Sequence, residues 1–450
     1  MKKFLLFAGL AAVALPSFAV VETATYEPYE GITCTNLYNI SRGHDPEAFL
    51  ATPMAEFTNK TRSMVVRDGK LYIAESRTIA PEDGESNDFG HLIVIDRNTG
   101  VVEGRVQLTV NGDPLKGLLC ANQIGVDDFG NIWVIGLVSS TATTPIRLYH
   151  IKDVTTGETE LIAELYLPED EAEAAGRHDY FDLVGDVTGV EAGTVVMTPV
   201  ASGFDTFVVG FEREQGSDDW DGHMDGYYSA PMMETYPADQ TTWNGAPMVR
   251  IVRDEDHSGS LFYVDAFVTH PTLYNTEGTM LESFADAGDL QPNNVGSNGV
   301  NEFSFAGRNF MIYTYTDYDK GVGTQVRLVE LGENQGFAGM KHVWDLPKGK
   351  GLGDVSDSGT RMMAMCPDIV TDGNGKQGCY LSLYKCNGGY ATYFLAEEGF
   401  ENSGVEGVEA DNVNAPVEYF NLQGVRVANP TAGSIVIARQ GTSVTKHIVK

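Results

Sequence analysis

The chain alternates apolar and polar residues in short runs that end at Gly, Asp or Asn, and this pattern recurs along most of its length. Residues 62–107 contain RSMVVRDGKLYIAESR and then HLIVIDRNTGVVEGRVQ. Residues 122–165 contain NQIGVDDFGNIWVIGL and then PIRLYHIKDVTTGETELIAEL. In both stretches a period of two residues, a D-G or D-x-G turn and a later NTG or TTG turn predict four antiparallel strands joined as a meander.

Four weaker copies of this unit follow along the chain. They lie at residues 181–212, 247–284, 300–331 and 367–395, and the last copy contains only three strands. Six units at intervals of about 45–65 residues are typical of β-propeller blades. A free strand with the sequence GITCTNLYNIS, at residues 31–41, would complete the last blade and remove two exposed sheet edges.

We therefore predict an all-β fold, a six-bladed β-propeller closed by an N-terminal strand and followed by a small C-terminal β domain. A seven-bladed propeller is the alternative, because residues 213–246 have room for a degenerate blade. An array of β-sandwiches is disfavoured, since the two best copies, at residues 62–107 and 122–165, are so alike that they indicate a repeated unit. The expected division is a signal peptide at 1–19, the propeller at 20–396, an acidic linker at 397–416 and the small domain at 417–450.

The blade pattern resembles that of uncharacterised secreted propeller families of Bacteroidota. The resemblance covers most of residues 31–396 and rests on the segments RDGKLYIAESR and DDFGNIWVIGL. It implies the fold and an exported protein, and it carries no catalytic signature.

The first residues and the overall charge predict where the protein acts. The start MKKFLLFAGLAAVALPSFA has a basic beginning, a short apolar stretch and a small residue before a plausible cut, as in a secretory signal peptide. No later stretch reaches the length of about 18 apolar residues that a membrane span needs. The formal net charge of −33 disfavours nucleic acids and anionic membranes, whose phosphates would repel the protein. We expect a secreted or cell-surface location.

The five cysteines give no metal or disulfide assignment. They are Cys34, Cys120, Cys366, Cys379 and Cys386. The odd number leaves at least one unpaired, and no CxxC motif with a distant His pair is present, which disfavours a zinc site. Export permits a disulfide, but the spacing alone assigns none. Cys120 and Cys366 occupy similar places in two blades, where we expect small buried residues rather than nucleophiles.

The C-terminal region changes composition twice. Residues 397–416 are acidic and poor in large apolar residues, which predicts a flexible linker. Residues 419–450 contain no Asp or Glu. The runs VEYFNLQGVRV, GSIVIARQG and SVTKHIVK, within residues 417–450, predict three short strands.

This tail resembles the C-terminal sorting domain of the type IX secretion system of Bacteroidota. The positions that match are Asn421, Leu422, Gln423, Gly424, Pro430 and Gly433, with Val427 and the closing residues 446–450. Ser434 and Val436 depart from the usual pattern. The resemblance implies a secretion machinery of this type as a partner and a surface fate. The alternative is a small β module without a sorting role.

The strongest ligand motif is DEDHSGSLFYVD, at residues 254–265. A calcium loop would take oxygens from Asp254, Asp256, Ser258, Ser260 and Asp265, because such a loop wraps one hard cation at these spacings. Asp replaces the usual Glu at the last position, and a strand follows where a helix is typical. The alternative is a hairpin turn, where Asp and Gly serve local geometry. Calcium is the one cofactor that the sequence suggests.

A second acidic run, GSDDWDGHMDGYYS, lies in the least regular part of the body, at residues 216–229. Its carboxylates and its Trp and Tyr side chains suggest a metal or sugar site, because aromatic rings stack on sugars. A solvated loop between blades is the interpretation that we favour.

The mouth of the central channel is the expected ligand site, because it is the main concavity of a propeller. The first strands of the blades begin near polar residues that would line a funnel of mixed charge for a sugar or peptide. These residues are Arg62, Asn122, Gln123, Asp182, Asn301, Glu302 and Asp368. The alternative is that they cap strands and bond water.

Two functions are compatible with these features. The first is an exported module that binds a glycan or peptide without catalysis, since neither G-x-S-x-G nor H-E-x-x-H is present. The second is an extracellular hydrolase or lyase acting on glycans, with paired carboxylates at the channel mouth. Two carboxylates about 5–9 Å apart beside an aromatic platform would favour the enzyme. Filling of the mouth by apolar side chains would exclude both.

Overall fold

The computed structural model separates into two units, the first covering Met1–Val370 and Gln377–Glu398 and the second covering Thr371–Lys376 and Gly399–Lys450. The residues that the structure describes are 21–22, 24–56, 59–79, 87–139, 144–166, 176–202, 205–228, 247–254, 257–266, 269–284, 287, 290, 299–317, 322–332, 336–353, 363–401, 418–420, 435–440 and 443–448. The predicted signal peptide at 1–19 and the sorting-motif residues Asn421 to Gly433 lie outside them.

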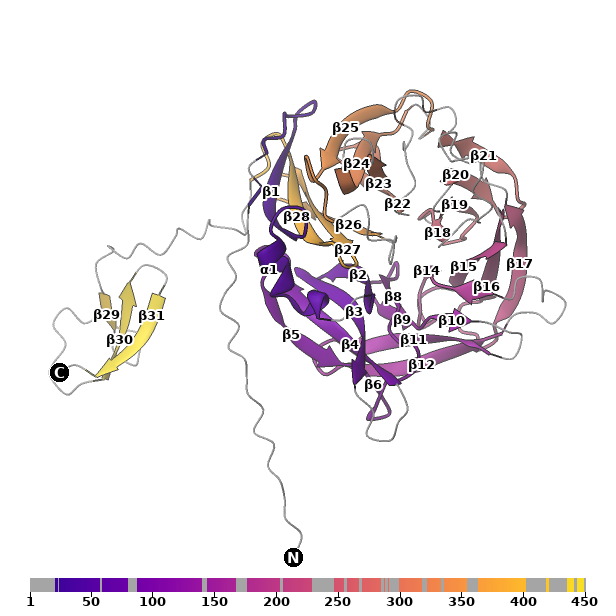
Figure 1. The fold of residues 1–450 in the computed structure, drawn as a ribbon, viewed down its shortest axis with the longest axis horizontal. Helices are drawn as coiled ribbons and strands as arrows, with labels where there is room; N and C mark the ends of the chain where they lie inside the picture. The colour runs from indigo at the N-terminus through magenta and orange to yellow at the C-terminus, as the bar shows by residue number, and fades with distance from the viewer. Residues whose placement is uncertain are drawn as a thin grey trace, which may run out of the picture. The chain divides into compact units, whose positions relative to one another are not determined.

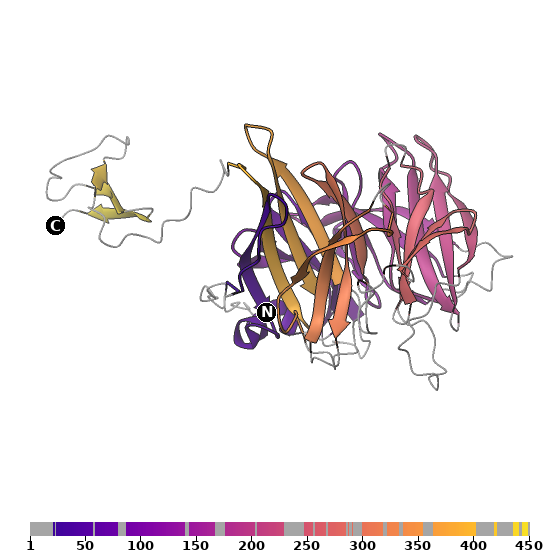
Figure 2. The ribbon, with the colours of Figure 1, turned by 90° about the horizontal axis from the view of Figure 1, so that it is seen from above.

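The first unit is a β-propeller of six blades arranged around a central channel (Figure 1). Seen at right angles, the strands of the blades run between the two faces of the ring (Figure 2). Blade 1 consists of β2 (Thr61–Arg67), β3 (Lys70–Ile79), β4 (Asn87–Asp96) and β5 (Val102–Gln107). Blade 2 consists of β8 (Gln123–Val126), β9 (Ile132–Ile135), β11 (Ile146–Asp153) and β12 (Glu158–Leu165), extended by β6 (Thr109–Val110) and β7 (Asp113–Pro114).

The next three blades follow the same order from the channel outwards. Blade 3 consists of β14 (Asp182–Gly185), β15 (Thr194–Ser202), β16 (Asp205–Arg213) and β17 (Asp221–Tyr228). Blade 4 consists of β18 (Met248–Ile251), β19 (Leu261–Ala266), β20 (Thr269–Asn275) and β21 (Met280–Ser283). Blade 5 consists of β22 (Val300–Phe305), β23 (Arg308–Asp317), β24 (Val322–Glu330) and β25 (Lys341–Leu346).

Blade 6 confirms the predicted closure by the N-terminal strand. It joins β26 (Met363–Thr371), β27 (Gln377–Lys385) and β28 (Gly389–Glu397) to β1 (Ile32–Ser41), which pairs antiparallel with β28. The seam between β1 and β28 is well packed, because Tyr38 of β1 is fully buried. Its ring meets the Tyr390 ring edge-on with the ring centres 5.9 Å apart, and its hydroxyl lies within hydrogen-bond distance of the Thr392 hydroxyl, at 2.7 Å. This pairing holds the two ends of the ring in one sheet and covers the edge of β28 that the last unit would otherwise expose.

The six-bladed prediction is correct, and the seven-bladed alternative is not. Residues 221–228, within the segment considered for a seventh blade, form the outer strand of blade 3. The sequence copy at 300–331 likewise missed its outer strand, β25. Both outer strands follow longer connections, at 214–220 and 331–340, than the outer strands of the better copies, so the spacing of those copies did not reveal them.

Local sequence explains the hairpins and the packing. Asp68 and Gly69 have φ values of 49° and 71°, the left-handed pair that a two-residue hairpin between β2 and β3 requires. In β3, Leu71 and Ile73 face one neighbouring blade, while Tyr72 and Ala74 face the other. The middle strands are apolar on both faces for this reason, since each blade is covered on two sides.

A few short elements complete the first unit. They are the helix α1 (Pro46–Leu50), the 3-10 turn η1 (Pro53–Ala55), and the paired strands β10 (Val138–Ser139) and β13 (Arg177–His178). Within the described residues, no helix is long and apolar enough to cross a membrane.

The second unit contains a small antiparallel sheet in the order β29 (Glu418–Phe420), β30 (Ile435–Gln440) and β31 (Ser443–Ile448). The three strands lie where the tail sequence predicts them. The acidic segment before the sheet lies mostly outside the described residues.

Candidate functional site

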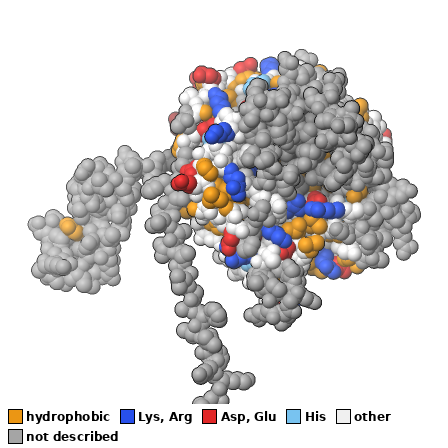
Figure 3. Space-filling model, in the orientation of Figure 1, with side chains coloured by type: hydrophobic (Ala, Val, Ile, Leu, Met, Phe, Trp, Pro, Cys, Tyr) orange, Lys and Arg blue, Asp and Glu red, His pale blue; other side chains and the backbone are white. Residues whose placement is uncertain are grey.

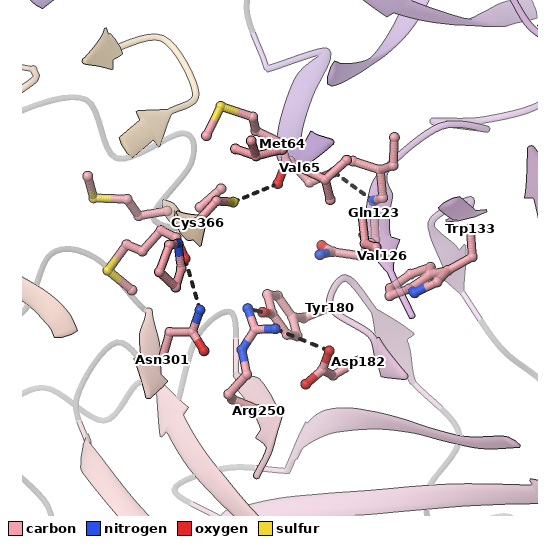
Figure 4. A pocket seen from close by; sticks show the side chains of 18 of the residues that line it. Met64, Val65, Gln123, Val126, Trp133, Tyr180, Asp182, Arg250, Asn301 and Cys366 are labelled. Atoms are coloured by element: carbon pink, nitrogen blue, oxygen red, sulfur yellow. Dashed lines mark hydrogen bonds and ion pairs between the residues drawn. The ribbon is translucent and has the colours of Figure 1, made fainter. Parts of the chain in front are cut away.

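The central channel holds a cavity of about 300 Å³ lined by residues of all six blades (Figure 4). Five of the seven residues expected at the mouth line it, namely Arg62, Gln123, Asp182, Asn301 and Glu302. Apolar side chains of β2, β8 and β26 share the wall with them. Among the described residues, apolar side chains therefore do not fill the channel, so both functions proposed for the mouth stand.

The two remaining expected residues lie elsewhere. Asn122 is fully buried behind Arg62, accepts a hydrogen bond from its Nη1 at 2.8 Å, and donates to the Asp179 carbonyl at 2.6 Å. Asp368 is absent from the cavity lining and pairs with Arg97, whose guanidinium lies 3.6 Å from the centre of the Tyr380 ring. Asn122 thus positions Arg62, and Asp368 belongs to a separate contact.

Arg62 is held in the wall by an ion pair across blades. Its Nη1 lies 2.8 Å from the Asp179 carboxylate, which also forms an ion pair with the Arg177 Nε at 2.6 Å. Only 9% of the Arg62 side chain is exposed. The carboxylate before blade 3 therefore neutralises the cation that blade 1 directs into the channel.

A second ionic group joins blades 3 and 4. The Asp182 Oδ1 lies 3.2 Å from Arg250 and 3.3 Å from Arg253, and its Oδ2 accepts the Ile251 N–H at 2.8 Å. The remaining Arg250 Nη2 donates to the Tyr180 hydroxyl at 2.7 Å. Figure 4 shows Tyr180, Asp182 and Arg250 turned toward one another at the cavity wall.

Burial shapes the protonation of this group. Burial alone would lower the pKa of Arg250, but Asp182 and Tyr180 outweigh it and raise that pKa. Burial also raises the pKa of Tyr180 to about 12. Arg250 is therefore charged and Tyr180 neutral at physiological pH, and the hydroxyl acts as an acceptor for the guanidinium.

Glu302 is the second carboxylate of the lining. Burial raises its pKa, and a hydrogen bond that the Tyr263 hydroxyl donates to its Oε1 lowers the pKa by less. The neighbouring Asn301 donates its amide to the Met365 carbonyl at 3.0 Å and so ties blade 5 to blade 6. Glu302 also faces a second cavity of about 180 Å³ between blades 4 and 5.

The residues of the wall that sequence reasoning missed include Trp133, Tyr180, Arg250 and Arg253. The sequence could have indicated Arg250, since it is a basic residue inside the apolar first strand MVRI. Trp133 lies on the second strand of its blade and reaches the channel only because Gly125 has no side chain. Neither feature shows which partner the side chain meets.

The structure places the predicted calcium ligands at two different sites. Asp254 accepts hydrogen bonds from the Ser258 amide at 3.0 Å and the Ser258 hydroxyl at 2.6 Å, and that hydroxyl contacts Ser260 at 2.9 Å. Asp256 lies outside the described residues.

Asp265 is not brought to that turn. It lies four residues beyond the start of β19, about 13 Å along an extended strand. It is 3% exposed and accepts the Gly299 N–H at 2.9 Å, and burial raises its pKa to about 7. Calcium binding stays a prediction, which titration calorimetry with Ca²⁺ before and after chelation would test.

The second acidic run is part loop and part strand. Residues 221–228 form β17. The Arg213 guanidinium lies over the ring of the preceding Trp220, 4.8 Å from the ring centre. A cavity of about 630 Å³ lies beside Trp220, Asp219 and Asp221. The side chains of residues 223–228 lie outside the described ones, so the sugar or metal interpretation has support only from this cavity.

No disulfide joins any of the five cysteines, all of which lie in the described part of the chain. Cys366 lines the channel and its Sγ contacts the Met64 carbonyl at 3.4 Å, and burial raises the pKa of Cys120 and Cys366 to about 12. Thiols with such pKa values are poor nucleophiles at neutral pH.

The described surface of the face in Figure 3 carries basic and acidic side chains interspersed.

Comparison with known proteins adds little beyond the fold. Protein-family models give no match, and neither do the curated proteins. Among solved structures, the chain is similar to a Trypanosoma rangeli sialidase in complex with the inhibitor DANA, with 11% identity, 76% of this chain and 55% of that chain covered, and a TM-score of 0.39.

Two further similar structures are named as an arabinanase and an endo-arabinase. A Penicillium chrysogenum alpha-L-arabinanase has 12% identity, 81% and 99% coverage of the two chains, and a TM-score of 0.40. An endo-arabinase from Bacteroides thetaiotaomicron has 8% identity, 78% and 97% coverage, and a TM-score of 0.34. The chain spans about half the length of the sialidase. Similarities this low carry no argument about ligand or activity. The assignment of the propeller fold is based on the sheet topology of this chain itself.

Proposed function

We propose that this propeller is a binding module that takes a glycan or peptide in its central channel. The observation that carries this proposal is the polar cavity of about 300 Å³, to which all six blades contribute. Its size is at the lower end of the range of about 300–1,000 Å³ for small-molecule sites. The occupant is therefore one sugar ring or side chain of a longer ligand, with the remainder outside the channel.

The state of the carboxylates favours binding over hydrolysis. Among the described residues that line the cavity, Asp182 and Glu302 are the only carboxylates. Both oxygens of Asp182 already accept hydrogen bonds or ion pairs from Arg250, Arg253 and the Ile251 amide. A general base or nucleophile needs a free oxygen directed at the substrate, and Asp182 offers none.

An array of glycans and peptides, probed with the purified full chain, tests the binding function. We expect one ligand class to bind, and binding to be lost when an excess of the same free ligand is added. If no glycan or peptide binds while thermal unfolding shows a folded chain, the binding proposal is wrong.

A glycan hydrolase is the second candidate, and Glu302 is the observation that favours it. Its pKa is raised by burial, as in the general acid of many glycosidases. The variant Glu302→Gln would remove this acid with little change in shape. Release of reducing sugar from a glycan panel by the wild type, and its loss in the variant, would support catalysis. No release by the wild type would exclude it.

We also propose that the protein is exported and displayed at the cell surface through a type IX-like secretion machinery. The support is the sequence pattern of residues 1–19 and the tail resemblance at 417–450. Secreted protein should begin at Val20, and removal of residues 417–450 should leave it inside the cell envelope. An unprocessed N-terminus would contradict the export step, and normal surface display without the tail would contradict the sorting step.

A further inference from the structure

Three buried polar atoms of the channel wall lack a hydrogen-bond partner among the described residues. They are Arg62 Nε, Gln123 Oε1 and Trp133 Nε1. Their residues are only 9%, 8% and 1% exposed, and all three line the cavity. A buried polar group without a partner costs about 1–3 kcal/mol, so these atoms mark a place where a ligand or water completes the site.

The fold of blade 2 places two of these atoms on one surface. Gly125 pairs directly with Trp133 across β8 and β9, and a Cβ at Gly125 would overlap the indole ring. Gln123 lies two residues before Gly125 and therefore on the same face of β8. The missing side chain at Gly125 thus lets the indole of the second strand reach the wall beside Gln123.

The charges near these atoms are already paired. Arg62 has Asp179 at 2.8 Å, and Arg250 and Arg253 share Asp182 at 3.2 and 3.3 Å. An anionic ligand would find no unpaired cation among these three. What the wall offers a ligand is a set of hydrogen-bonding groups whose one charge is already paired, with two N–H donors and one amide oxygen as acceptor.

A hydroxyl group fits this set, because it both donates and accepts hydrogen bonds. A carboxylate accepts only and would leave the Gln123 oxygen without a donor. Neighbouring hydroxyls of one sugar ring bring several donors and acceptors into a cavity of this size, whereas an extended peptide advances about 3.3 Å per residue and brings few.

We propose that Arg62, Gln123 and Trp133 bind the hydroxyls of a neutral saccharide in the channel. This inference rests on the proposed binding function and selects, from glycan and peptide, the uncharged glycan. Gln123 accepts from one hydroxyl, and the Arg62 and Trp133 N–H groups donate to its neighbours.

The test measures binding of neutral mono- and oligosaccharides, uronic acids and peptides to the full chain by array, followed by calorimetry. Gln123→Met removes the acceptor at similar volume, and Trp133→Phe removes the indole N–H. Gln377→Met and Trp344→Phe are matched controls, because these two side chains lie outside the cavity lining and bond the Ala306 amide and the Glu27 carbonyl. Thermal unfolding of every variant checks that it folds.

We expect a neutral saccharide to bind, Gln123→Met and Trp133→Phe each to weaken it about tenfold, and both controls to leave it unchanged. Binding of peptides or uronic acids alone would overturn this inference and leave the binding function intact. Equal saccharide affinity in the wild type and both channel variants would mean that water fills the site, and would also overturn it. Absence of any ligand would refute the inference and the binding function together.

Discussion

The layers between the blades and the wall of the channel are built from the same strands but in opposite ways. In the layer between blades 1 and 2, Val65, Tyr72, Ile124 and Val134 pack as buried apolar side chains. At the channel ends of the same blades, Arg62 and Asn122 are held by hydrogen bonds and an ion pair across blades. The layers specify the ring, and the wall leaves polar groups for a ligand.

This difference affects how mutations act. A residue of a layer contributes through buried area and close packing, which many apolar neighbours share. A residue of the wall contributes through one or two named partners, so its loss leaves a specific charge or polar atom unpaired. Changes in the two regions should therefore differ in size, in pH dependence and in their effect on ligand binding.

The largest loss of stability is expected in the layer beside the closing seam. Tyr38→Ala empties a fully buried site between blades 6 and 1 and should lower the free energy of unfolding by about 3–5 kcal/mol in urea titrations. Leu161→Ala, at an exposed position, should cost under about 0.5 kcal/mol. Similar losses at both positions would contradict closure through β1.

The next effect concerns the ionic group in the wall. Asp182→Asn leaves the partly buried Arg250 without the counter-charge of the buried Asp182 and should destabilise the protein by about 3 kcal/mol. Adding Arg250→Met should recover part of this loss, because the unpaired charge disappears. Glu158→Gln, which breaks an exposed pair with Lys152, should cost less than about 1 kcal/mol. If the double variant is less stable than the single one, the pairing argument fails.

A smaller effect on the free energy of unfolding should depend on pH, through an ion pair on the outer strand of blade 5. Burial opposes ionisation of Asp345, but His342 and Arg327 outweigh it and lower its pKa to about 2, with Arg327 Nε at 2.7 Å. The unfolded chain therefore binds this proton more readily, so the contribution of about 2 kcal/mol is present above about pH 4 and is lost toward pH 2.

The variant Asp345→Asn isolates this contribution. The stability difference between wild type and variant should be largest near pH 5 and shrink as the pH falls to 2, measured by urea unfolding at each pH. A difference that stays constant over this range would show that Asp345 acts through shape rather than charge.

Much of the fold could be predicted from the sequence because its signals are local. The D-G turn at Asp68 and the alternation in β3 are readable within about ten residues, and the unpaired strand 31–41 matched the three-stranded last unit. The outer strands β17 and β25 were missed because long connections, at 214–220 and 331–340, separate them from the preceding strands of their blades.

The site was less predictable, since it depends on which blade lies beside which. Placing polar residues at strand starts was enough to find Arg62, Gln123 and Asp182. It did not reveal that Asn122 lies behind Arg62, that Asp368 turns to Arg97, or that Trp133 reaches the wall over Gly125. Those relations join residues far apart in sequence and require the closed ring.

The most direct test of a ligand site in the channel is to fill the cavity without changing its polar groups. Ala364→Phe and Val126→Phe add a ring to the lining from blades 6 and 2. Calorimetry with the ligand found on the array should show at least tenfold weaker binding in either variant that keeps the thermal unfolding midpoint of the wild type. Undiminished affinity in such folded variants would contradict the account, because the ligand would then bind outside the channel.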